Sequence, residues 1–492
     1  MRGATVRAEG SPSRETGALR LVLLAALVAG AAARLALAFL RPVWADEVFT
    51  LALARRPLAD LLSALRLDSG PPLHYLAAHL VLLPFPSPGP ADVAVRLISV
   101  AASLLHVPLL LSIGRRRRAP RAGTIAASLF LVLPLAASSG AEGRGYALAS
   151  LLALAALERL LALEESPRAG AAILAGLLGG AALLTHYLAL LPVSGMLLAR
   201  LATGRARRLV LLAGAVAAGV AAPWLPVALG QPRASMAWAR VQPLGERALQ
   251  FAANLALGLS VPPSAALLLG PLSLALLAAA VSTRRGARVP AALPLLAALA
   301  LLAPLLLYSS SALLPDRTAL LLLPLVTLVL AEARAVVPAS AGPAAAAVLA
   351  ASLPAALRAT PGSELAATLA PEVRSGARVV AAGLWGPELD YRLEREGLAG
   401  RVALYPSDVA RHPGWYEESG IDAARLDAEA RAAVSTAPAR TFFVLSRATM
   451  AGQALARELT ARGGARVADG GVFEVWLRTG GPQASRAVPG PS

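Results

Sequence analysis

Long apolar stretches, separated by short charged or proline-rich segments, dominate the chain up to about residue 357. The first covers residues 19–40, which is enough helix to cross the ~30 Å hydrocarbon core of a bilayer. Further candidate spans follow at about 93–114, 122–139, 145–163, 170–185, 186–201, 209–229, 264–283, 290–308, 318–333 and 340–357. The pattern predicts an α-helical multi-span membrane protein with about 11 transmembrane helices.

Three of these segments allow another interpretation. A cleaved signal peptide is the alternative for 19–40, since Ala31, Ala32 and Ala33 resemble a cleavage site. Residues 170–201 could form one long broken segment instead of two spans. The apolar stretch 74–85 is too short to span, and is typical of a re-entrant or interfacial helix.

The pattern changes after about residue 360, where charged residues become more frequent and apolar runs shorter. Residues 379–384, 442–445 and 472–477 have the composition or alternation of β-strands, and 424–434 and 452–462 have helical patterns. We therefore expect a small extracytoplasmic α/β domain at 360–479. It would follow a disordered cytoplasmic N-terminus at 1–18 and a transmembrane catalytic domain at 19–359, and precede a disordered tail at 480–492.

Composition agrees with a membrane protein. Of the 492 residues, 57% are hydrophobic and 15% charged, and the mean hydropathy is +0.63. There is no cysteine, which excludes disulfides and thiolate metal sites, and every basic residue apart from histidine is an arginine. The net charge of +17 does not indicate nucleic-acid binding, because the arginines collect in loops between apolar segments.

Arginine placement orients the predicted spans. If the N-terminus is inside, three arginine groups fall inside, at 115–121, 205–208 and 284–288, which is the positive-inside pattern. The same map places a second set of polar segments outside: the first outer loop at 41–92, then 138–146, 185–187, 223–263 and 308–317. The polar residues of interest therefore share one face of the membrane.

The first outer loop carries the most distinctive acids. Asp46 and Glu47 are adjacent and lie just beyond the first apolar stretch, where a carboxylate can act as a general base near a hydrophobic substrate. A helix N-terminal pair that favours the helix dipole is the alternative. Asp68 precedes Pro71 and Pro72, which either orient its side chain or simply stiffen the loop.

The order of these motifs resembles the GT-C glycosyltransferase superfamily. The resemblance rests on Arg34 in the first apolar stretch and on the short motifs at 44–47, 68–75, 96–99, 142–148 and 185–187. It covers about residues 20–200, and less clearly extends to 335. Within the superfamily the sequence is most similar to bacterial membrane mannosyltransferase-like proteins, related to protein O-mannosyltransferases and the aminoarabinose transferase of lipid A.

The resemblance implies a mechanism. Family members pass a sugar from a polyprenyl-phosphate donor to an acceptor on the outer face of the membrane, with inversion. Asp46 would be the general base, with Glu47 beside it as a second catalytic residue. Arginines would hold the donor phosphate because the planar guanidinium can bind two phosphate oxygens: Arg34, Arg96, Arg144 and Arg317.

Each arginine also has another interpretation. Snorkelling to the interface is the alternative for Arg34, and an ion pair with Glu142 is the alternative for Arg144. Arg317 is followed by Thr318, where the family more often has tyrosine. The remaining candidates are expected to bind substrate, although His186 could be purely structural: Asp68, His74, Tyr75, Glu142, Tyr146, His186 and Tyr187.

No cofactor is expected, and no phosphate-binding glycine loop that would indicate a nucleotide-sugar donor is present. A divalent metal on Asp46, Glu47 and Asp68 stays open in principle, but a monophosphate carrier needs less charge neutralisation than a pyrophosphate. The expected location is a bacterial cell membrane, with the active site and the C-terminal domain extracytoplasmic. In that domain Tyr391, Trp415 and Tyr416 could stack on a sugar or lie in its core.

Two other functions compete. A lipid or glycolipid transporter or flippase would also have many spans, but transporters place their polar residues near the bilayer midplane. A membrane scaffold with a partner-binding outer domain would not need the acids of the first outer loop. The acceptor, whether protein, lipid or polysaccharide, is not specified by the sequence.

Overall fold

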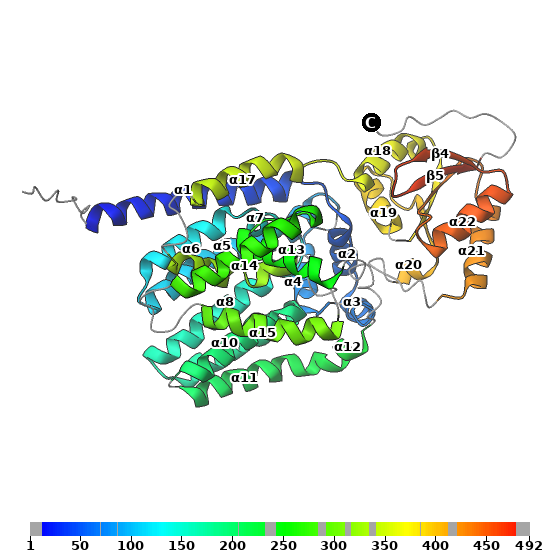
Figure 1. Ribbon diagram of the computed structural model, residues 1–492. Coiled ribbons are helices and arrows are strands. Elements are labelled where there is room, and N and C mark those ends of the chain that lie inside the picture. The colour runs from blue at the N-terminus through cyan, green and yellow to red at the C-terminus, as the bar shows by residue number, and fades with distance from the viewer. Residues whose placement is uncertain are drawn as a thin grey trace, which may run out of the picture.

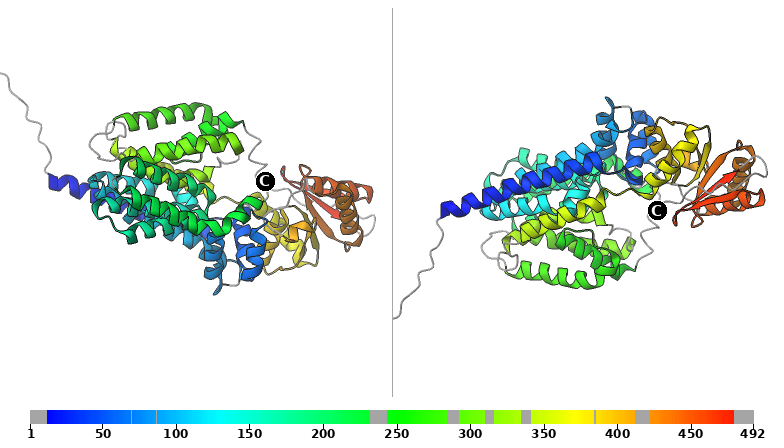
Figure 2. Two further views of the ribbon diagram at one scale, coloured as in Figure 1. Left: turned by 90° about the horizontal axis from the view of Figure 1, so that it is seen from below. Right: turned by 90° about the horizontal axis from the view of Figure 1, so that it is seen from above.

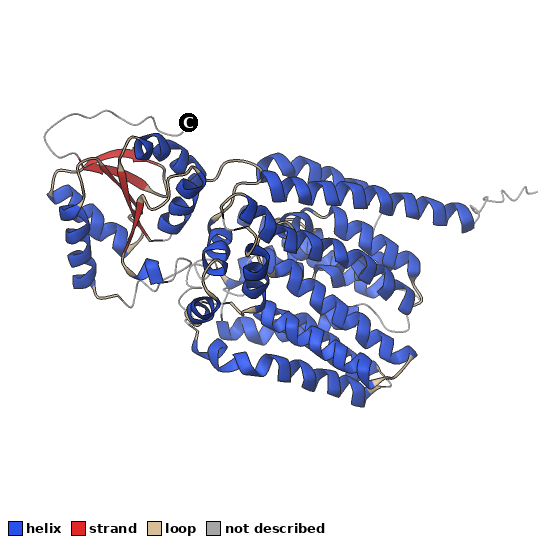
Figure 3. Cartoon of the chain, turned by 180° about the vertical axis from the view of Figure 1, so that it is seen from behind, coloured by secondary structure: helices blue, strands red, loops and turns tan. Residues whose placement is uncertain are grey.

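A computed structural model describes residues 12–68, 70–85, 87–204, 206–231, 243–283, 292–309, 316–333, 341–383, 385–411 and 421–478. Figure 1 shows a helical body, which the long helix α1 enters from one side, and a sheet with its own helices at the other side. Figure 3 shows that, among the described residues, the strands lie in this second part. Short helices lie between the two parts.

The helical body contains α1 to α17. The helices with their bounds are α1 Pro12–Leu40, α2 Ala45–Ala54, α3 Leu58–Leu65, α4 Leu73–Leu82, α5 Pro90–Arg116, α6 Pro120–Val132, α7 Pro134–Ser139, α8 Tyr146–Glu165, α9 Ala169–Thr185, α10 Leu190–Thr203, α11 Arg207–Ala221, α12 Leu225–Gly230, α13 Leu244–Leu257, α14 Pro263–Thr283, α15 Ala292–Ser309, α16 Leu323–Glu332 and α17 Ala341–Ala356. Short 3₁₀ helices join some of them: η1 Tyr187–Ala189, η2 Ala222–Trp224 and η5 Asp316–Leu321.

Six helical segments within the described residues are long and apolar enough to cross a membrane: 17–40, 90–116, 146–165, 207–230, 263–282 and 342–374. Shorter apolar helices of 10–17 residues lie among them. The chain is therefore mostly helical and has several candidate membrane spans, while the expected number of 11 spans stays a prediction. The stretch 74–85, expected to be a short helix, forms α4.

One expected span is interrupted. We predicted a single apolar helix over 122–139, but α6 ends at Val132 and α7 begins at Pro134. Leu133, between them, has an extended backbone with φ −68° and ψ 125°, as expected for a residue before proline. The break leaves carbonyl groups at the end of α6 without helical partners, and a buried arginine uses them, as described below.

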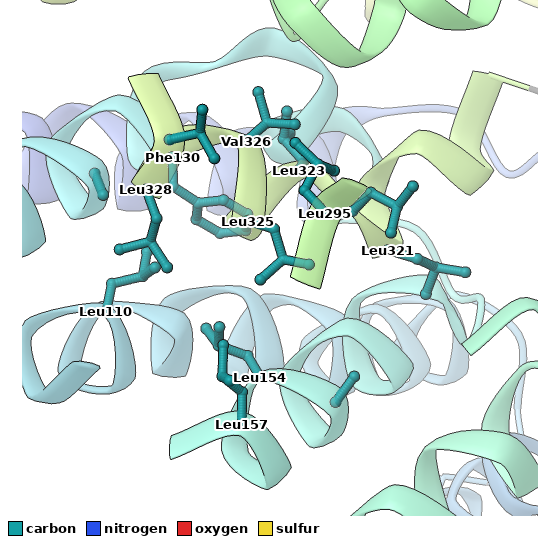
Figure 4. Close-up of a cluster of buried hydrophobic side chains, with 14 of the residues drawn as sticks. Leu110, Phe130, Leu154, Leu157, Leu295, Leu321, Leu323, Leu325, Val326 and Leu328 are labelled. Atoms are coloured by element: carbon teal, nitrogen blue, oxygen red, sulfur yellow. The ribbon is translucent and has the colours of Figure 1, made fainter. Parts of the chain in front are cut away.

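The helical core positions η5, which carries Arg317. Leu320 and Leu321 of η5 and the following side chains of α16 are buried in the main hydrophobic cluster of the body. Figure 4 shows Leu323, Leu325 and Leu328 of α16 beside Phe130, Leu110 and Leu154, which come from three other helices. The apolar contacts therefore fix the start of α16, and with it the end of η5.

The C-terminal part contains the helices α18 Pro361–Arg374, α19 Trp385–Arg395, α20 Asp408–Arg411, α21 Ala423–Thr436 and α22 Met450–Ala461 and the strands β1 Arg378–Ala382, β2 Val402–Tyr405, β3 Thr441–Leu445, β4 Ala465–Asp469 and β5 Glu474–Arg478. The strand order is β2-β1-β3-β5-β4, with β1 parallel to β2 and β3 and with β5 antiparallel to β3 and β4. The three expected strands are confirmed as β1, β3 and β5, whereas β2 and β4 were not predicted.

Apolar side chains cover both faces of this sheet. Alternate residues of β1 and β3 point to opposite faces, so that Val379 and Phe442 pack with α18 and α19 and Val380 and Phe443 pack with α21 and α22. Burial on both faces explains why β3 is continuously apolar. Figure 2 shows this part at the far side of the body from the start of α1.

Candidate functional site

The two adjacent acids of the first loop lie in the first turn of α2, where negative charge favours the helix dipole. Trp44 is the N-cap residue, and its backbone N–H donates to Oε2 of Glu47 at 3.4 Å. The two carboxylates then point to different surroundings. The side chain of Glu47 is 3% exposed, whereas that of Asp46 is 33% exposed.

Glu47 is bound on both oxygens by Arg96 of α5. Nε of Arg96 donates to Oε1 at 2.8 Å, and Nη2 donates to Oε2 at 2.6 Å. The backbone N–H of Gly143 adds a third bond to Oε1 at 2.8 Å. Burial by itself would raise the pKa of Glu47, but Arg96, Arg41 and the Gly143 amide hold that pKa below its ordinary value. Glu47 is therefore an ionised, fully paired group.

Arg96 has no spare donor for a substrate. Besides Glu47, its guanidinium donates to the backbone carbonyls of Ala38, Arg41 and Pro42 at 3.0, 2.8 and 3.2 Å. Its side chain is 3% exposed. The expectation that Arg96 binds the donor phosphate has no support in this geometry; instead, Arg96 fastens the end of α1 and the start of α2 to α5.

Asp46 faces Arg317, which the chain brings from η5. Nη1 of Arg317 lies 3.0 Å from Oδ2 of Asp46, and its Nε lies 3.5 Å from Oε2 of Glu142. The guanidinium also stacks on the Trp44 ring, 3.8 Å from its centroid. Since the side chains of Asp46 and Arg317 are both about one-third exposed, at 33% and 30%, this pair remains reachable.

Glu142 is the third carboxylate, and it is buried. Arg41 approaches its Oε1 at 3.6 Å, and Arg317 approaches its Oε2, which accepts no hydrogen bond from the described residues. Burial is the main reason that the pKa of Glu142 is raised; Arg317 and Arg41 oppose the shift, and Glu47 and Asp46 add to it. Glu142 thus depends on shared arginines for its charge compensation.

Arg144 lies on the other side of Asp46. Its Nη1 donates to the backbone carbonyl of Asp46 and to Oγ1 of Thr50, both at 3.2 Å, and to the Tyr75 hydroxyl at 3.4 Å. Tyr75 in turn donates to Oδ2 of Asp68 at 2.8 Å. The expected residues Asp68, Tyr75 and Arg144 are therefore brought together next to α2, and within the described part of the chain the guanidinium of Arg144 donates only through Nη1.

We call the group Arg41, Asp46, Glu47, Arg96, Glu142, Arg144 and Arg317 the charged cluster. It combines three carboxylates with four guanidiniums from α2, α5, η5 and the loops that follow α1 and α7. The glycines beside Arg144 allow this packing: a Cβ at Gly145 would lie 2.9 Å from the carbonyl oxygen of Thr185.

The two candidate histidines each bond to the backbone through one ring nitrogen. Nε2 of His74 lies 3.1 Å from the Gly143 carbonyl, so it carries the proton. Nδ1 of His186 accepts from the backbone N–H of Leu188 at 3.2 Å, and the His186 ring lies 4.8 Å from that of Tyr146. Burial, followed by repulsion from Arg144 and His74, lowers the pKa of His186 to about 3, so it is neutral.

Tyr187 braces the Asp68 loop from outside the cluster. Its hydroxyl donates to Oε1 of Gln231 at 2.8 Å and accepts from Nε1 of Trp224 at 2.9 Å. Gln231 then donates through Nε2 to the carbonyls of Leu65 and Gly70 at 2.8 and 3.0 Å. The Tyr187 hydroxyl is thus part of a hydrogen-bond chain that holds this loop, and its expected substrate contact stays a prediction.

Arg34 is separate from the charged cluster. Its guanidinium donates to Ser103 Oγ at 2.7 Å and to the carbonyls of Leu131, Gly30 and Phe130 at 2.7, 2.9 and 3.3 Å. It is 0% exposed. Arg34 satisfies the carbonyls that the break before Pro134 leaves free, so neither interfacial snorkelling nor the expected phosphate contact fits its position.

Two members of this region were missed by sequence reasoning. Arg41 follows directly after α1 and shares Glu47 and Glu142 at 3.6 Å each; its position immediately after the first apolar stretch was an available signal. Gln231 gave no signal, because its role depends on loop carbonyls about 160 residues earlier. Trp415 and Tyr416 lie outside the described residues.

The described residues contain no group of three or more histidine, aspartate and glutamate side chains that could hold a metal ion. The carboxylates of the cluster are compensated by guanidiniums. A cavity of about 580 Å³ occurs elsewhere, between β1, β2 and α21 of the sheet part. Chemically, the cluster offers one reachable carboxylate, Asp46, flanked by two guanidiniums.

Residues 69–227 match the family model described as dolichyl-phosphate-mannose-protein mannosyltransferase. This range contains Tyr75, which is the hydrogen-bond partner of Asp68, and also Arg96, Glu142 and Arg144. A search of curated proteins found no match.

The solved structures that resemble the chain include ArnT from Cupriavidus metallidurans. With undecaprenyl phosphate bound, it is 16% identical over 95% of this chain and 100% of that chain, with a TM-score of 0.48. In its apo state it is 16% identical over 96% of this chain and 100% of that chain, with a TM-score of 0.49. The archaeal oligosaccharyltransferase AglB from Archaeoglobus fulgidus is 12% identical over 78% of this chain and 64% of that chain, with a TM-score of 0.44.

The family match covers the part of the chain that supplies Arg96, Glu142 and Arg144 to the charged cluster and Tyr75 beside it, and it agrees with the resemblance found in the sequence motifs. The surrounding fold is mostly helical with several apolar segments long enough to span a bilayer. About a third of the chain, residues 69–227, is therefore similar to the dolichyl-phosphate-mannose-protein mannosyltransferase family.

Proposed function

We propose that the chain transfers a mannose-like sugar from a polyprenyl-phosphate donor to an acceptor hydroxyl, with Asp46 as the general base. The observation that carries this proposal is the contrast among the three carboxylates. Glu47 is bound on both oxygens and Glu142 is buried, whereas Asp46 is 33% exposed and its side chain pairs with Arg317 alone among the described residues. A base must reach the proton that it removes.

The reaction forms one bond and breaks one. The acceptor oxygen attacks the anomeric carbon while its proton passes to Asp46, and the bond from that carbon to the phosphate oxygen breaks. Attack from the face opposite the leaving group gives inversion. The leaving lipid phosphate is a stable anion, so what the site must supply is positive charge rather than a strong acid.

Arg317 and Arg144 are the proposed phosphate ligands. Both flank Asp46, and each retains guanidinium N–H groups that donate to no described residue. A fork of two parallel N–H groups suits two phosphate oxygens. Arg34 and Arg96, whose donors are occupied by protein carbonyls and by Glu47, have positioning roles in this proposal.

Glu47 also changes role relative to our expectation. Its bonds to Arg96 and to the Gly143 amide hold the first turn of α2 against α5 and the loop 140–145. We therefore assign Glu47 to the placement of Asp46 and not to proton transfer. Glu142 is likewise assigned a positioning role, because it pairs with Arg317 and Arg41.

The family match supports the proposed donor class, because its description names dolichyl-phosphate-mannose. The proposed setting is the outer face of a bacterial cell membrane, with the charged cluster and the sheet part extracytoplasmic. Arginine-rich segments at the other end of the bundle, such as 115–118 and 207–208, would then face the cytoplasm. Guanidiniums already compensate the carboxylates, so the proposal requires no divalent metal.

A transporter is not favoured. The reachable carboxylate and the available guanidiniums gather at one end of the bundle, whereas a transporter site would lie near the bilayer midplane.

The test uses the full chain in proteoliposomes with a polyprenyl-phosphate sugar and cell-envelope acceptors. Asp46→Asn should lower transfer by about 10²–10⁴-fold, the range expected for loss of a general base. Asp60→Asn is the matched control, because Asp60 is an exposed aspartate in the first turn of the neighbouring helix α3. Full activity of Asp46→Asn would refute the proposed base, and absence of transfer in the wild type would refute the function.

A further inference from the structure

Helix α19 belongs to the sheet part by sequence but packs along α2 in the body. Tyr391, near the middle of α19, is 5% exposed and lies in an apolar cluster with Val43, Val48, Leu51 and Ala54. Tyr391 therefore does not lie in the core of the sheet part, which was one of its two expected locations. Figure 1 shows α19 on the side of the sheet part that faces α2.

Polar contacts join α19 to both ends of α2. Nη2 of Arg392 donates to the carbonyl of Val43, which precedes the N-cap residue Trp44. At the other end, Glu394 pairs with Arg55, the C-cap residue, at 3.1 Å. The Arg55 guanidinium also lies over the Tyr391 ring, 5.0 Å from its centroid.

Helix α19 also contacts the first turn of α5. The Tyr391 hydroxyl donates to Oδ1 of Asp92, and Arg395 pairs with Oδ2 of Asp92 at 2.9 Å. Asp92 is 4% exposed. Arg96 lies one turn further along α5 and holds Glu47, so that α19, α5 and α2 form one connected polar assembly behind Asp46.

A helix as short as α2, with 10 residues, does not keep its position by its own hydrogen bonds. The place of α2 is set by the elements that pack on it, and α19 contacts α2 at both ends of α2. Catalytic geometry is sensitive to such support, since a displacement of about 1 Å can cost about 10²-fold in rate.

We infer that α19 is a splint for α2 and that Tyr391 is a positioning residue for Asp46. The sheet part is then a component of the catalytic centre, beyond any contact that it makes with an acceptor. This inference rests on the proposed function for its kinetic consequence, but the mechanical link between Tyr391 and α2 can be measured without any activity.

The test compares Tyr391→Phe with Tyr405→Phe in the full chain. Tyr391→Phe removes one hydroxyl and keeps the ring packing, and Arg395 still pairs with Asp92. Tyr405 is the matched control: it is also buried in the sheet part, at 3% exposed, but its hydroxyl donates to the Leu426 carbonyl of α21. Two measurements are made, hydrogen–deuterium exchange of residues 45–54 and steady-state sugar transfer.

We expect faster amide exchange across α2 in Tyr391→Phe and unchanged exchange there in Tyr405→Phe. We also expect kcat to fall about tenfold in Tyr391→Phe with the KM for the lipid donor unchanged. Because the effect acts through Asp46, it should disappear when Tyr391→Phe is added to Asp46→Asn. If Tyr391→Phe instead caused a global loss of structure, it would lower sugar transfer by the same factor in the wild type and in Asp46→Asn.

Unchanged exchange in α2 of Tyr391→Phe would overturn the inference, even if the wild type transferred no sugar. Faster exchange with an unchanged kcat would also overturn it, because α2 would then move without consequence for Asp46. Equal losses in Tyr391→Phe and Tyr405→Phe would show a general effect on the sheet part and contradict the splint.

Discussion

The two ends of the helical body both hold arginines and carboxylates, but they pair them differently. At one end is the charged cluster, where Arg317 is shared between Asp46 at 3.0 Å and Glu142 at 3.5 Å, and Arg41 between Glu47 and Glu142 at 3.6 Å each. At the other end, called here the opposite end, arginines and glutamates meet directly: Arg116 with Glu158 and Glu165, Arg117 with Glu332, and Arg200 with Glu164.

The opposite end joins helix termini. Arg116 is the last residue of α5 and Arg117 is its C-cap; they contact Glu158 and Glu165 in the second half of α8 and Glu332 at the end of α16, and Arg200 near the end of α10 contacts α8. The charged cluster instead has one complete pair, Glu47 with Arg96, and around it charges that share partners at longer distances. Arginines that lie farther from their carboxylates can turn to an incoming anion at lower cost than arginines in direct contact with theirs, which is the difference that we connect with catalysis.

The largest expected effect concerns the complete pair. Glu47→Gln leaves Arg96 buried without its counter-charge, and should lower the free energy of unfolding by about 3–5 kcal/mol. Glu165→Gln is the control at the opposite end. Its side chain is 52% exposed, and loss of such an exposed pair should cost about 1 kcal/mol or less. Thermal unfolding in detergent measures both, and similar losses would break the distinction between the ends.

The next effect concerns the shared arginines. In our proposal Arg317 stabilises the leaving phosphate, so Arg317→Gln should lower sugar transfer by about 10²–10³-fold. Arg116→Gln removes a cation of the opposite end and should leave the rate per folded molecule within about twofold, because that end makes no contact with reacting groups. Initial rates of sugar transfer check both variants. Equal losses would mean that the cluster has no special relation to the donor.

A smaller effect is expected in the pH dependence. The pKa of Glu142 is raised, chiefly by burial, so acidification protonates it and weakens its attraction for Arg317 before an ordinary glutamate would respond. The acid limb of kcat/KM should therefore lie above the usual glutamate range. Because the folded-state pKa is the higher one, Glu142 lowers stability as pH rises from its unfolded to its folded pKa, and the acid limb is not caused by unfolding through this group.

The variant Glu142→Gln tests whether Glu142 causes the acid limb of the rate profile. The neutral amide imitates the protonated acid, so we expect the rate near neutral pH to fall about tenfold and the acid limb to be lost. Rate profiles of the two proteins across the acidic range make the comparison. An acid limb that stays unchanged in Glu142→Gln would assign it to another residue.

The smallest effect concerns a neutral residue beside the cluster. Gln231→Ala removes the donors to Leu65 and Gly70 and should cost about 1–2 kcal/mol of stability, with only a few-fold change in rate. Gln453→Ala is the control, since Gln453 donates to a single carbonyl on the exposed surface of the sheet part. A loss of transfer as large as that of Arg317→Gln would mean that the Asp68 loop belongs to the reacting groups.

Sequence reasoning located the cluster better than it assigned the arginines. Asp46, Glu142, Arg144 and Arg317 were expected on one face and are within one cluster, because apolar stretches of span length fix which loops share an end of a bundle. The partner of each guanidinium depends on packing between helices. Arg96 and Arg34 look alike along the sequence, yet one meets a carboxylate and the other meets the carbonyls of a broken helix.

The secondary structure was predictable to a similar degree. Periodicity and apolar runs located β1, β3 and β5, whereas β4, with mostly exposed residues and a bulge between Arg466 and Ala468, lacks such a signal. Pro134 was the sequence signal for the break in the predicted span at 122–139, but the prediction gave more weight to the apolar composition of this stretch. No pattern could predict that α19 packs on α2, since the two helices are more than 300 residues apart.

The most direct test of this account is a structure of the full chain with polyprenyl phosphate bound. The account predicts that the phosphate oxygens contact Arg317 and Arg144 beside Asp46, with Arg34 and Arg96 keeping their present partners. A phosphate held by Arg34, by Arg96 or by arginines of the opposite end, with none near Asp46, would contradict it.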